Sequence, residues 1–183
     1  MTLQCTAYIA TSLDGFIAGE SGDLSWLDAA NALMPEGEYC GFSAFMDSID
    51  YLVMGRNTYE KVLSFGGDWV YNKPVIVLSS RYLAIPEHLK DKVSASSQPI
   101  HELCEKLMLQ GAKRVYIDGG FTIRRFIEAK LLTDIEITLI PTAIGKGVSL
   151  LSGLAQEQKF TLLDTKVYDF GFVQLKYGLE YGN

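Results

Sequence analysis

The sequence predicts an α/β fold, a single domain (residues 1–183) with a mixed, mostly parallel sheet and helices on both faces. Three observations predict it. Apolar runs such as residues 3–11 and 75–78 suit strands that are buried on both faces. Helical segments alternate with such strands through the middle of the chain, which favours parallel pairing with right-handed crossovers. Near the end, two alternating runs flank Asp169-Phe170-Gly171, a pattern typical of an antiparallel hairpin at one edge of the sheet.

The elements are expected in a regular order along the chain. Strands are expected at residues 3–11, 51–54, 75–78, 115–117, 135–140, 160–168 and 172–177. Helices are expected at about residues 42–49, 59–65, 100–108 and 122–129. Apolar residues repeat with helical spacing from Ile100 to Met108, and Gly111 suits the end of that helix. Asn57 and Glu60 resemble a capping box at the start of the helix 59–65, whereas residues 16–19 and 22–41 are expected to be irregular.

Composition excludes several classes of function. The formal net charge of −6 disfavours a nucleic-acid partner, because phosphate contact needs a basic face. Three cysteines without CxxC spacing and two histidines predict neither a disulfide framework nor a metal site. The N-terminal residues do not form a signal peptide, and no run approaches the length of a membrane span. We therefore expect a cytoplasmic protein that binds neither nucleic acid, membrane nor metal.

Three donor-rich segments follow predicted strands, and ligands of open α/β sheets bind beyond the carboxyl ends of the strands. The segments are Gly55–Thr58, Ser79–Arg81 and Gly119–Thr122. Two of them begin helices, whose free N–H groups suit a pyrophosphate, and Arg56 and Arg81 could hold a further phosphate. Each segment has a plainer interpretation, since glycine pairs mark turns and a single arginine is commonly a solvated charge. The combination at successive strand ends favours a phosphorylated ligand, although no G-x-G-x-x-G or P-loop motif occurs.

Several motifs resemble those of one enzyme superfamily. Val53-Met54-Gly55-Arg56-Asn57-Thr58-Tyr59-Glu60 is similar to the strand-to-helix signature of dihydrofolate reductases and their riboflavin-pathway relatives. Ile117-Asp118-Gly119-Gly120 with Phe126 resembles their second glycine turn, and residues 138–150 resemble their late strand and following loop. The segment 12–18, Ser-Leu-Asp-Gly-Phe-Ile-Ala, resembles the reductase domain of bacterial riboflavin biosynthesis in particular. The motifs keep their order from residue 12 to 151, over most of the chain.

The resemblance implies a dihydrofolate reductase-like fold that binds NADPH. It assigns phosphate contacts to Gly55, Arg56 and Thr58. It places Leu78, Ser79, Ser80 and Arg81 beside the adenosine and its 2′-phosphate. It places Gly119, Gly120, Phe121 and Thr122 behind the pyrophosphate and nicotinamide, and Ala10 and Ile17 in the nicotinamide pocket. The implied reaction is hydride transfer to a small heterocycle, such as a pterin or a ribosylaminopyrimidine.

The proton donor is the least defined part of this hypothesis. Dihydrofolate reductases carry a carboxylate on the helix before the Met-Gly-Arg strand, but residues 41–46 of this chain contain none. Asp14 is the preferred catalytic candidate because it follows the first strand, although Asp14-Gly15 is also a turn signal. Trp26 and Asp28 are candidate substrate-binding residues, and a core position for Trp26 is the alternative.

Two other functions stay open at this point. The missing carboxylate favours a nucleotide-binding protein of the same fold without turnover, and a scaffold with no cofactor is a further alternative. An aromatic C-terminal hairpin, with Phe170, Phe172, Tyr177 and Tyr181, suits either core packing or the interface of a homodimer, the expected assembly.

Overall fold

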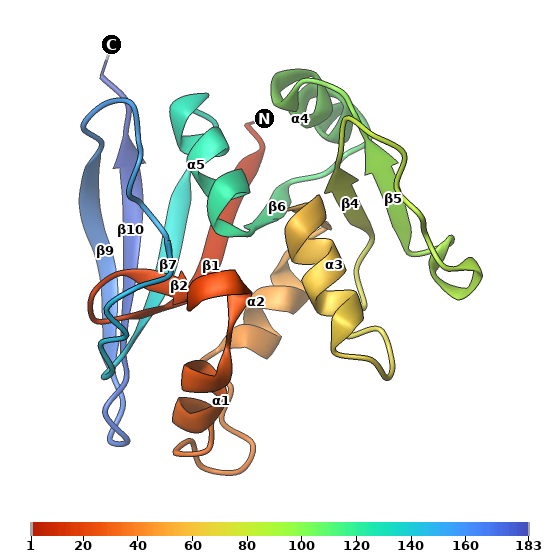
Figure 1. Cartoon of the computed structure of the whole chain (residues 1–183). Coiled ribbons are helices and arrows are strands. Elements are labelled where there is room, and N and C mark those ends of the chain that lie inside the picture. Colours follow the sequence, from red (N-terminus) through yellow and green to blue (C-terminus); the bar gives the residue numbers. More distant parts are fainter. Residues whose placement is uncertain (1, 183) are drawn as a thin grey trace.

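The computed structural model describes residues 2–182, and one eight-stranded sheet runs through them (Figure 1). The strand order is β5-β4-β3-β6-β1-β7-β10-β9. These strands are β1 (Gln4–Ser12), β3 (Tyr51–Gly55), β4 (Val75–Leu78), β5 (Val93–Ser96), β6 (Arg114–Asp118), β7 (Asp134–Ile140), β9 (Lys159–Val167) and β10 (Val173–Glu180). Two short strands, β2 (Phe16–Ala18) and β8 (Val148–Ser149), pair antiparallel beside the sheet.

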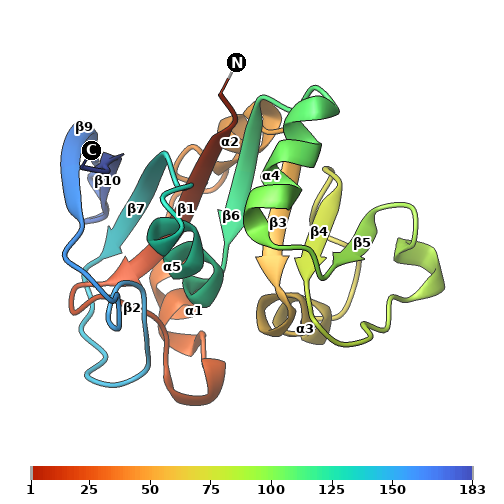
Figure 2. The same cartoon turned by 90° about the horizontal axis from the view of Figure 1, so that it is seen from above.

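The pairing confirms the predicted mixed sheet. The strands β1, β3, β4, β5, β6 and β7 pair with one another in parallel. The C-terminal strand β10 runs antiparallel to both β7 and β9, so the hairpin extends one edge of the sheet. The carboxyl ends of β3, β4 and β6 therefore lie together at one end of the sheet (Figure 2).

Helices cover both faces of the parallel part. The helices are α1 (Ser25–Asn31), α2 (Phe42–Ser48), α3 (Arg56–Ser64), α4 (Ile100–Leu109) and α5 (Gly120–Glu128), with 3-10 turns at Glu20–Gly22 and Glu87–Leu89. Successive strand residues point to opposite faces. Val53 and Ile117 pack in the core beneath α4 and α5, whereas Met54 and Tyr116 pack against α2 and α3. Burial on both faces explains why these strands are apolar throughout.

The helix predicted from its apolar spacing is confirmed as α4. Leu103 and Leu107 are buried on its inner face. The helix ends at Leu109, and two residues later Gly111 has a φ of +90°, which favours glycine. The next N–H, that of Ala112, donates to the Leu107 carbonyl.

Several predicted boundaries were wrong. The capping box does not form, because α3 begins at Arg56 with Gly55 as its N-cap, and the Glu60 side chain binds Arg56 instead. Residues 16–18 form strand β2, and the segment 22–41 contains helix α1, in which only Ala30 is buried. Strand β5 was missed because its sequence, Val-Ser-Ala-Ser, is polar, as suits a half-exposed edge strand. No helix among residues 2–182 is both long and apolar enough to cross a membrane.

Candidate active site

A cleft of about 430 Å³ opens at the carboxyl ends of β3, β4 and β6. Parallel strands bring these ends together, which is where ligands of open α/β sheets bind. The residues that line the cleft are Gly55, Arg56, Asn57, Thr58, Leu78, Ser79, Ser80, Arg81, Ser96, Ser97, Gln98, Gly119, Phe121, Thr122 and Arg125. Residues of all three predicted strand-end segments are among them.

The first turns of two helices, α3 and α5, lie close together in this cleft, and glycines make this close approach possible. A Cβ atom on Gly119 would lie 2.2 Å from the Thr58 hydroxyl oxygen, and one on Gly55 would lie 2.9 Å from that of Thr122. Each glycine is the N-cap of its helix, and each threonine is the third residue of the other helix. Neither N-cap has a side-chain hydrogen bond, so both helix starts present free N–H groups. Such a pair of helix starts suits an anion.

The charge of the cleft is opposite to that of the chain. Arg56, Arg81 and Arg125 line the cleft, and no aspartate or glutamate does. The chain as a whole has a formal net charge of −6. Three guanidinium groups without a lining carboxylate make a local positive pocket on an acidic protein.

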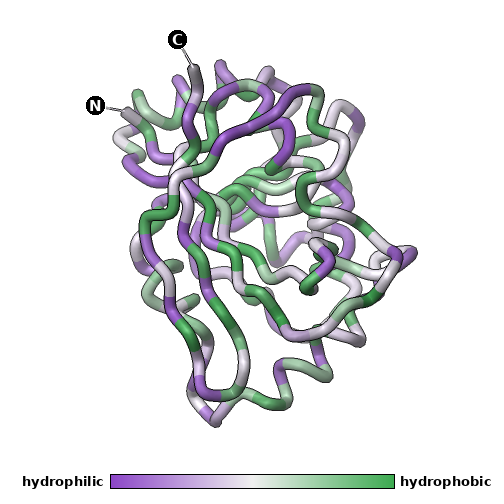
Figure 3. The backbone as a smooth tube through the Cα atoms, turned by 90° about the vertical axis from the view of Figure 1, so that its left-hand side faces the viewer, coloured by the Kyte–Doolittle hydropathy of each residue, from purple (hydrophilic) through white to green (hydrophobic). Residues whose placement is uncertain are grey.

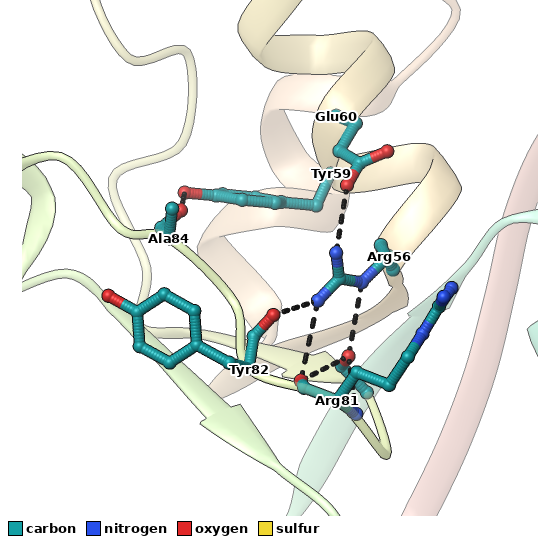
Figure 4. A network of polar contacts seen from close by, with 7 residues as sticks. Arg56, Tyr59, Glu60, Arg81, Tyr82 and Ala84 are labelled. Carbon is teal, nitrogen blue, oxygen red and sulfur yellow. Dashed lines mark hydrogen bonds and ion pairs between the residues drawn. The ribbon is translucent and has the colours of Figure 1, made fainter.

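The Arg56 guanidinium binds the loop that follows β4 (Figure 4). Its Nε donates to the Ser79 hydroxyl at 3.1 Å, and its Nη2 donates to the carbonyl oxygens of Arg81, at 3.3 Å, and Tyr82. Its Nη1 contacts the Glu60 carboxylate at 3.3 Å. The Arg81 side chain extends away from this cluster in Figure 4.

The structure brings most of the predicted cofactor residues together. Ten line the cleft: Gly55, Arg56, Thr58, Leu78, Ser79, Ser80, Arg81, Gly119, Phe121 and Thr122. Gly120 lies next to them, and a Cβ atom on it would lie 2.6 Å from Cδ1 of Ile17. Ala10 packs instead against the cluster that contains Ile140 and Phe172.

Sequence reasoning missed four residues of the cleft. Ser96 ends β5 and Ser97 and Gln98 follow it, and all three were missed because that strand was not recognised. Arg125 comes one helical turn after Thr122, on the helix that was predicted to begin there. The helical spacing from Thr122 was the available signal for Arg125.

Asp14 joins two loops outside the cleft. Its carboxylate accepts hydrogen bonds from the Ser12 hydroxyl at 2.6 Å and from the N–H groups of Ile144 at 3.2 Å and Gly145 at 2.7 Å. The Ser12 hydroxyl and these two N–H groups lower the pKa of Asp14. These hydrogen bonds connect the loop after β1 with the loop after β7, and they favour the charged form of the Asp14 carboxylate. The predicted catalytic role of Asp14 therefore has no support from its position and remains a prediction.

Asp118 is an acid that the sequence analysis did not select. It ends β6 immediately before Gly119, whose N–H donates to it at 2.8 Å. Burial raises the pKa of Asp118 to about 6, while that N–H and the hydroxyls of Tyr116 and Tyr71 oppose the shift. A carboxyl group that titrates near neutral pH suits proton transfer. The sequence signal available was an acid directly before the glycine turn.

The two predicted substrate residues lie elsewhere. Trp26 lines a separate, open hollow of about 600 Å³ with Glu20, Asp23 and Lys146, and its ring packs beside the cluster around Phe172. Asp28 is exposed on α1. Neither residue lines the cleft. Among residues 2–182, no group of three or more His, Cys, Asp or Glu side chains is placed to hold a metal ion.

Comparisons with protein-family models, known sequences and solved structures show which proteins this chain is similar to. The family model of the RibD C-terminal domain matches residues 4–174. YwjB of Bacillus subtilis is 30% identical over 179 residues, which cover 97% of this chain and 98% of YwjB. A crystal structure from Shewanella sp. PV-4, of a protein assigned to riboflavin biosynthesis, is 37% identical with a TM-score of 0.91, over 98% of this chain and 100% of that one.

More distant structures share the fold. A Thermotoga maritima deaminase/5-amino-6-(5-phosphoribosylamino)uracil reductase has a TM-score of 0.70 at 16% identity, over 97% of this chain and 57% of that protein. Enterococcus faecalis dihydrofolate reductase, complexed with NADP(H), has a TM-score of 0.65 at 18% identity, over 97% of both chains. The chain shares its fold with these reductase structures, and the match over residues 4–174 shows that this protein belongs to the RibD C-terminal domain family.

Proposed function

We propose that this protein is an NADPH-dependent reductase that transfers hydride to a small heterocycle, such as a pterin or a ribosylaminopyrimidine. The observation that carries the proposal is the cleft, which is lined by two uncapped helix starts and three arginines and by no carboxylate. NADPH is a strongly anionic ligand with phosphates at two places, and it supplies the hydride in reductases. The cleft offers charge and N–H donors for those phosphates.

The residues divide into three parts along the cofactor. The helix starts at Gly55–Thr58 and Gly119–Thr122 suit the pyrophosphate, because their N–H groups are free. The serines and Arg81 after β4, with Ser96–Gln98 at the end of β5, suit the adenosine end. Ile17, which lies against Gly120, suits the nicotinamide end, where it would help to exclude water.

Asp118 does not line the cleft itself, but it directly precedes the lining residue Gly119, and we prefer it as the proton donor. A raised pKa of about 6 leaves part of the population protonated near neutral pH, whereas the hydrogen bonds to Asp14 keep that group charged. Asp118 also directly precedes the glycine turn at which Ile17 lies. We propose that Asp118 supplies or relays the proton that a C=N or C=O acceptor needs. The proposal for Asp14 as the acid remains as the competing assignment.

A direct experiment mixes the protein with NADPH and a panel of pterins and ribosylaminopyrimidines, and follows the absorbance of the reduced nicotinamide. We expect oxidation with at least one member of the panel, and slower oxidation with NADH. NADPH binding without oxidation across the panel would favour the second candidate, a nucleotide-binding protein without turnover. The observation that favours this candidate is helix α2, which places the apolar Phe42 and Phe45, and no carboxylate, in its first turn.

We also propose that the protein is a cytoplasmic homodimer. Cys5, Cys40 and Cys104 are buried free thiols, which suit a reducing compartment. Phe172 of the C-terminal hairpin is buried, and the partly buried Phe170 and Tyr177 pack against core clusters, so these three rings contribute to the core. The hairpin exposes aliphatic residues on β9 instead, and Figure 3 shows hydrophobic residues among hydrophilic ones on this side of the molecule.

A further inference from the structure

We propose that Cys5 and Cys104 are a redox-active pair, which a hydroperoxide converts into a disulfide inside the folded protein. Cys5 lies on β1, and Cys104 lies on the second turn of α4. Their sulfur atoms are 4.0 Å apart, although the two cysteines are 99 positions apart in the sequence. Neither residue lines the cleft, and the reaction of this pair does not require the proposed cofactor.

The packing of α4 on the sheet brings the two sulfur atoms into direct contact. A separation of 4.0 Å leaves no room for another atom between them. Both residues belong to the apolar cluster beneath α4 and α5, where Cys5 is 1% and Cys104 is 8% exposed. The S–S bond of a disulfide is about 2 Å long, so the sulfur atoms must approach by about 2 Å. Rotation about the two Cα–Cβ bonds, with a small shift of α4, can supply this movement.

Cys40 provides a comparison within the same chain. It is a free thiol that is 7% exposed, so its access to solvent is similar to that of Cys104. Its sulfur lies 3.8 Å from the thioether sulfur of Met34, which cannot form a disulfide. Burial also raises the pKa of the Cys40 thiol. Exposure therefore does not distinguish Cys40 from Cys104, whereas the presence of a neighbouring thiol does.

Cys104 is the thiol that we expect to react first. A thiolate, not a thiol, is the nucleophile toward an oxidant. The neighbouring Cys5 thiol lowers the pKa of Cys104, while burial opposes this shift. The contact with Cys104 and burial both raise the pKa of Cys5. The thiolate therefore forms preferentially on Cys104, which is also the more exposed of the two.

The reaction proceeds in two steps, written here for hydrogen peroxide. The Cys104 thiolate attacks one peroxide oxygen, the O–O bond breaks, and the sulfur becomes a sulfenic acid while hydroxide leaves and takes up the thiol proton as water. The Cys5 sulfur then attacks the sulfenic sulfur, and the S–O bond breaks as the S–S bond forms. The hydroxyl group leaves with the Cys5 proton as a second water. The two thiols together lose two electrons and two protons, and one peroxide is reduced to two waters.

The disulfide would join β1 to α4 in a reversible way. In a reducing compartment such a bond is transient, because thiol reductants restore both thiols by exchange. A cross-link between residues so far apart in the sequence restricts the unfolded chain strongly. We therefore expect the oxidised protein to melt at a higher temperature than the reduced protein, and a reductant to reverse this rise.

The test exposes the folded wild-type protein to hydrogen peroxide, unfolds it in the presence of a thiol-alkylating reagent, and measures the intact mass. We expect three alkylated thiols before oxidation and one after it, with the loss of two hydrogens. A protease digest should contain a linked peptide that joins Cys5 to Cys104 and disappears on reduction. Cys40→Ala, the matched control, should form the same link, whereas Cys5→Ala and Cys104→Ala should form none.

Other results would overturn the proposal. Three free thiols in the peroxide-treated wild type, a linked peptide that contains Cys40, or a link between two chains would exclude the pair. A link that forms only when peroxide is added in urea would show that the bond cannot close in the folded core, and so would a lower melting temperature after oxidation. These readouts come from the wild-type protein, so they decide the question even if Cys5→Ala does not fold.

Discussion

At the scale of single residues, two glycines with the same positive φ have different surroundings. Gly111 and Gly119 both have a φ of +90°. A Cβ atom on Gly111 would meet nothing within 4 Å, whereas one on Gly119 would lie 2.2 Å from the Thr58 hydroxyl oxygen. Gly111 follows the end of a helix, and Gly119 lets two helix starts approach each other at the cleft. Replacing Gly111 thus strains the backbone alone, whereas replacing Gly119 also forces an atom into a packed site.

We therefore expect Gly119→Ala to cost more stability than Gly111→Ala. A backbone conformation that favours glycine costs an alanine about 1–3 kcal/mol, and forcing an atom into a packed site adds about 1–3 kcal/mol. Urea denaturation of both variants measures the difference. Equal losses in the two variants would show that the helix starts do not pack as described.

Asp118 should make the stability of the folded protein depend on pH, and this dependence can be measured without a substrate. Its folded-state pKa of about 6 lies above its ordinary value of 3.8, chiefly because of burial. The folded protein thus keeps a proton that the unfolded chain releases. This contribution to stability is fully present below about pH 4 and is lost as the pH rises to about 6.

We expect Asp118→Asn to remove this loss of stability between about pH 4 and pH 6. Turnover of the wild type should fall as the pH rises through that pKa, and the variant should lose both the fall and most of the activity. Asp14→Asn is the control, because its lowered pKa acts in the opposite sense: its stabilising contribution is lost as the pH falls. A stronger loss of turnover in Asp14→Asn than in Asp118→Asn would restore Asp14 as the acid.

At the scale of elements, the sequence predicted those with a clear apolar pattern and missed those without one. Helix α4 and strands β4 and β7 were found because their apolar residues face a core. Strand β5 was missed because, as a half-exposed edge strand, it needs little apolar surface. The early start of α3 was missed because no side chain caps it, so the usual signal is absent.

Strand β9 is the element most open to a second copy of the chain. Register places Val167 beside Val173 and Leu162 beside Tyr177, so these side chains share one face of the hairpin. Val167 is 72% exposed and Leu162 is 53% exposed. A strand with an exposed apolar face at a sheet edge suits a two-fold interface.

We expect Leu162→Asp to convert a dimer into a monomer, because a carboxylate at a buried interface costs far more than one in water. Sedimentation velocity reports the change. Leu109→Asp is the matched control, since Leu109 is 87% exposed on α4, away from the hairpin. A wild-type protein that sediments as a monomer would rule out the dimer, and a dimer unchanged by Leu162→Asp would place the interface elsewhere.

At the scale of the whole molecule, the sheet determines which predictions from sequence were possible. Ten of the predicted cofactor residues line the cleft because they lie at the carboxyl ends of neighbouring parallel strands. Ligands of open α/β sheets bind at those ends, so the order of strands and helices in the sequence was enough to predict this part of the site. The acid could not be chosen in the same way, since the pKa of Asp118 depends on burial by segments far away in the sequence. The contacts of Arg56 with the loop after β4 also needed the structure, because hydrogen bonds to loop carbonyls leave no pattern in the residue types.

The central claim is that this cleft binds a phosphorylated nicotinamide nucleotide. Calorimetric titration of the wild-type protein with NADPH tests it most directly. We expect saturable binding of one NADPH per chain, weakened by salt because the contacts are ionic, with a rise in melting temperature on saturation. The absence of both heat and a shift in melting temperature at millimolar NADPH would contradict the account.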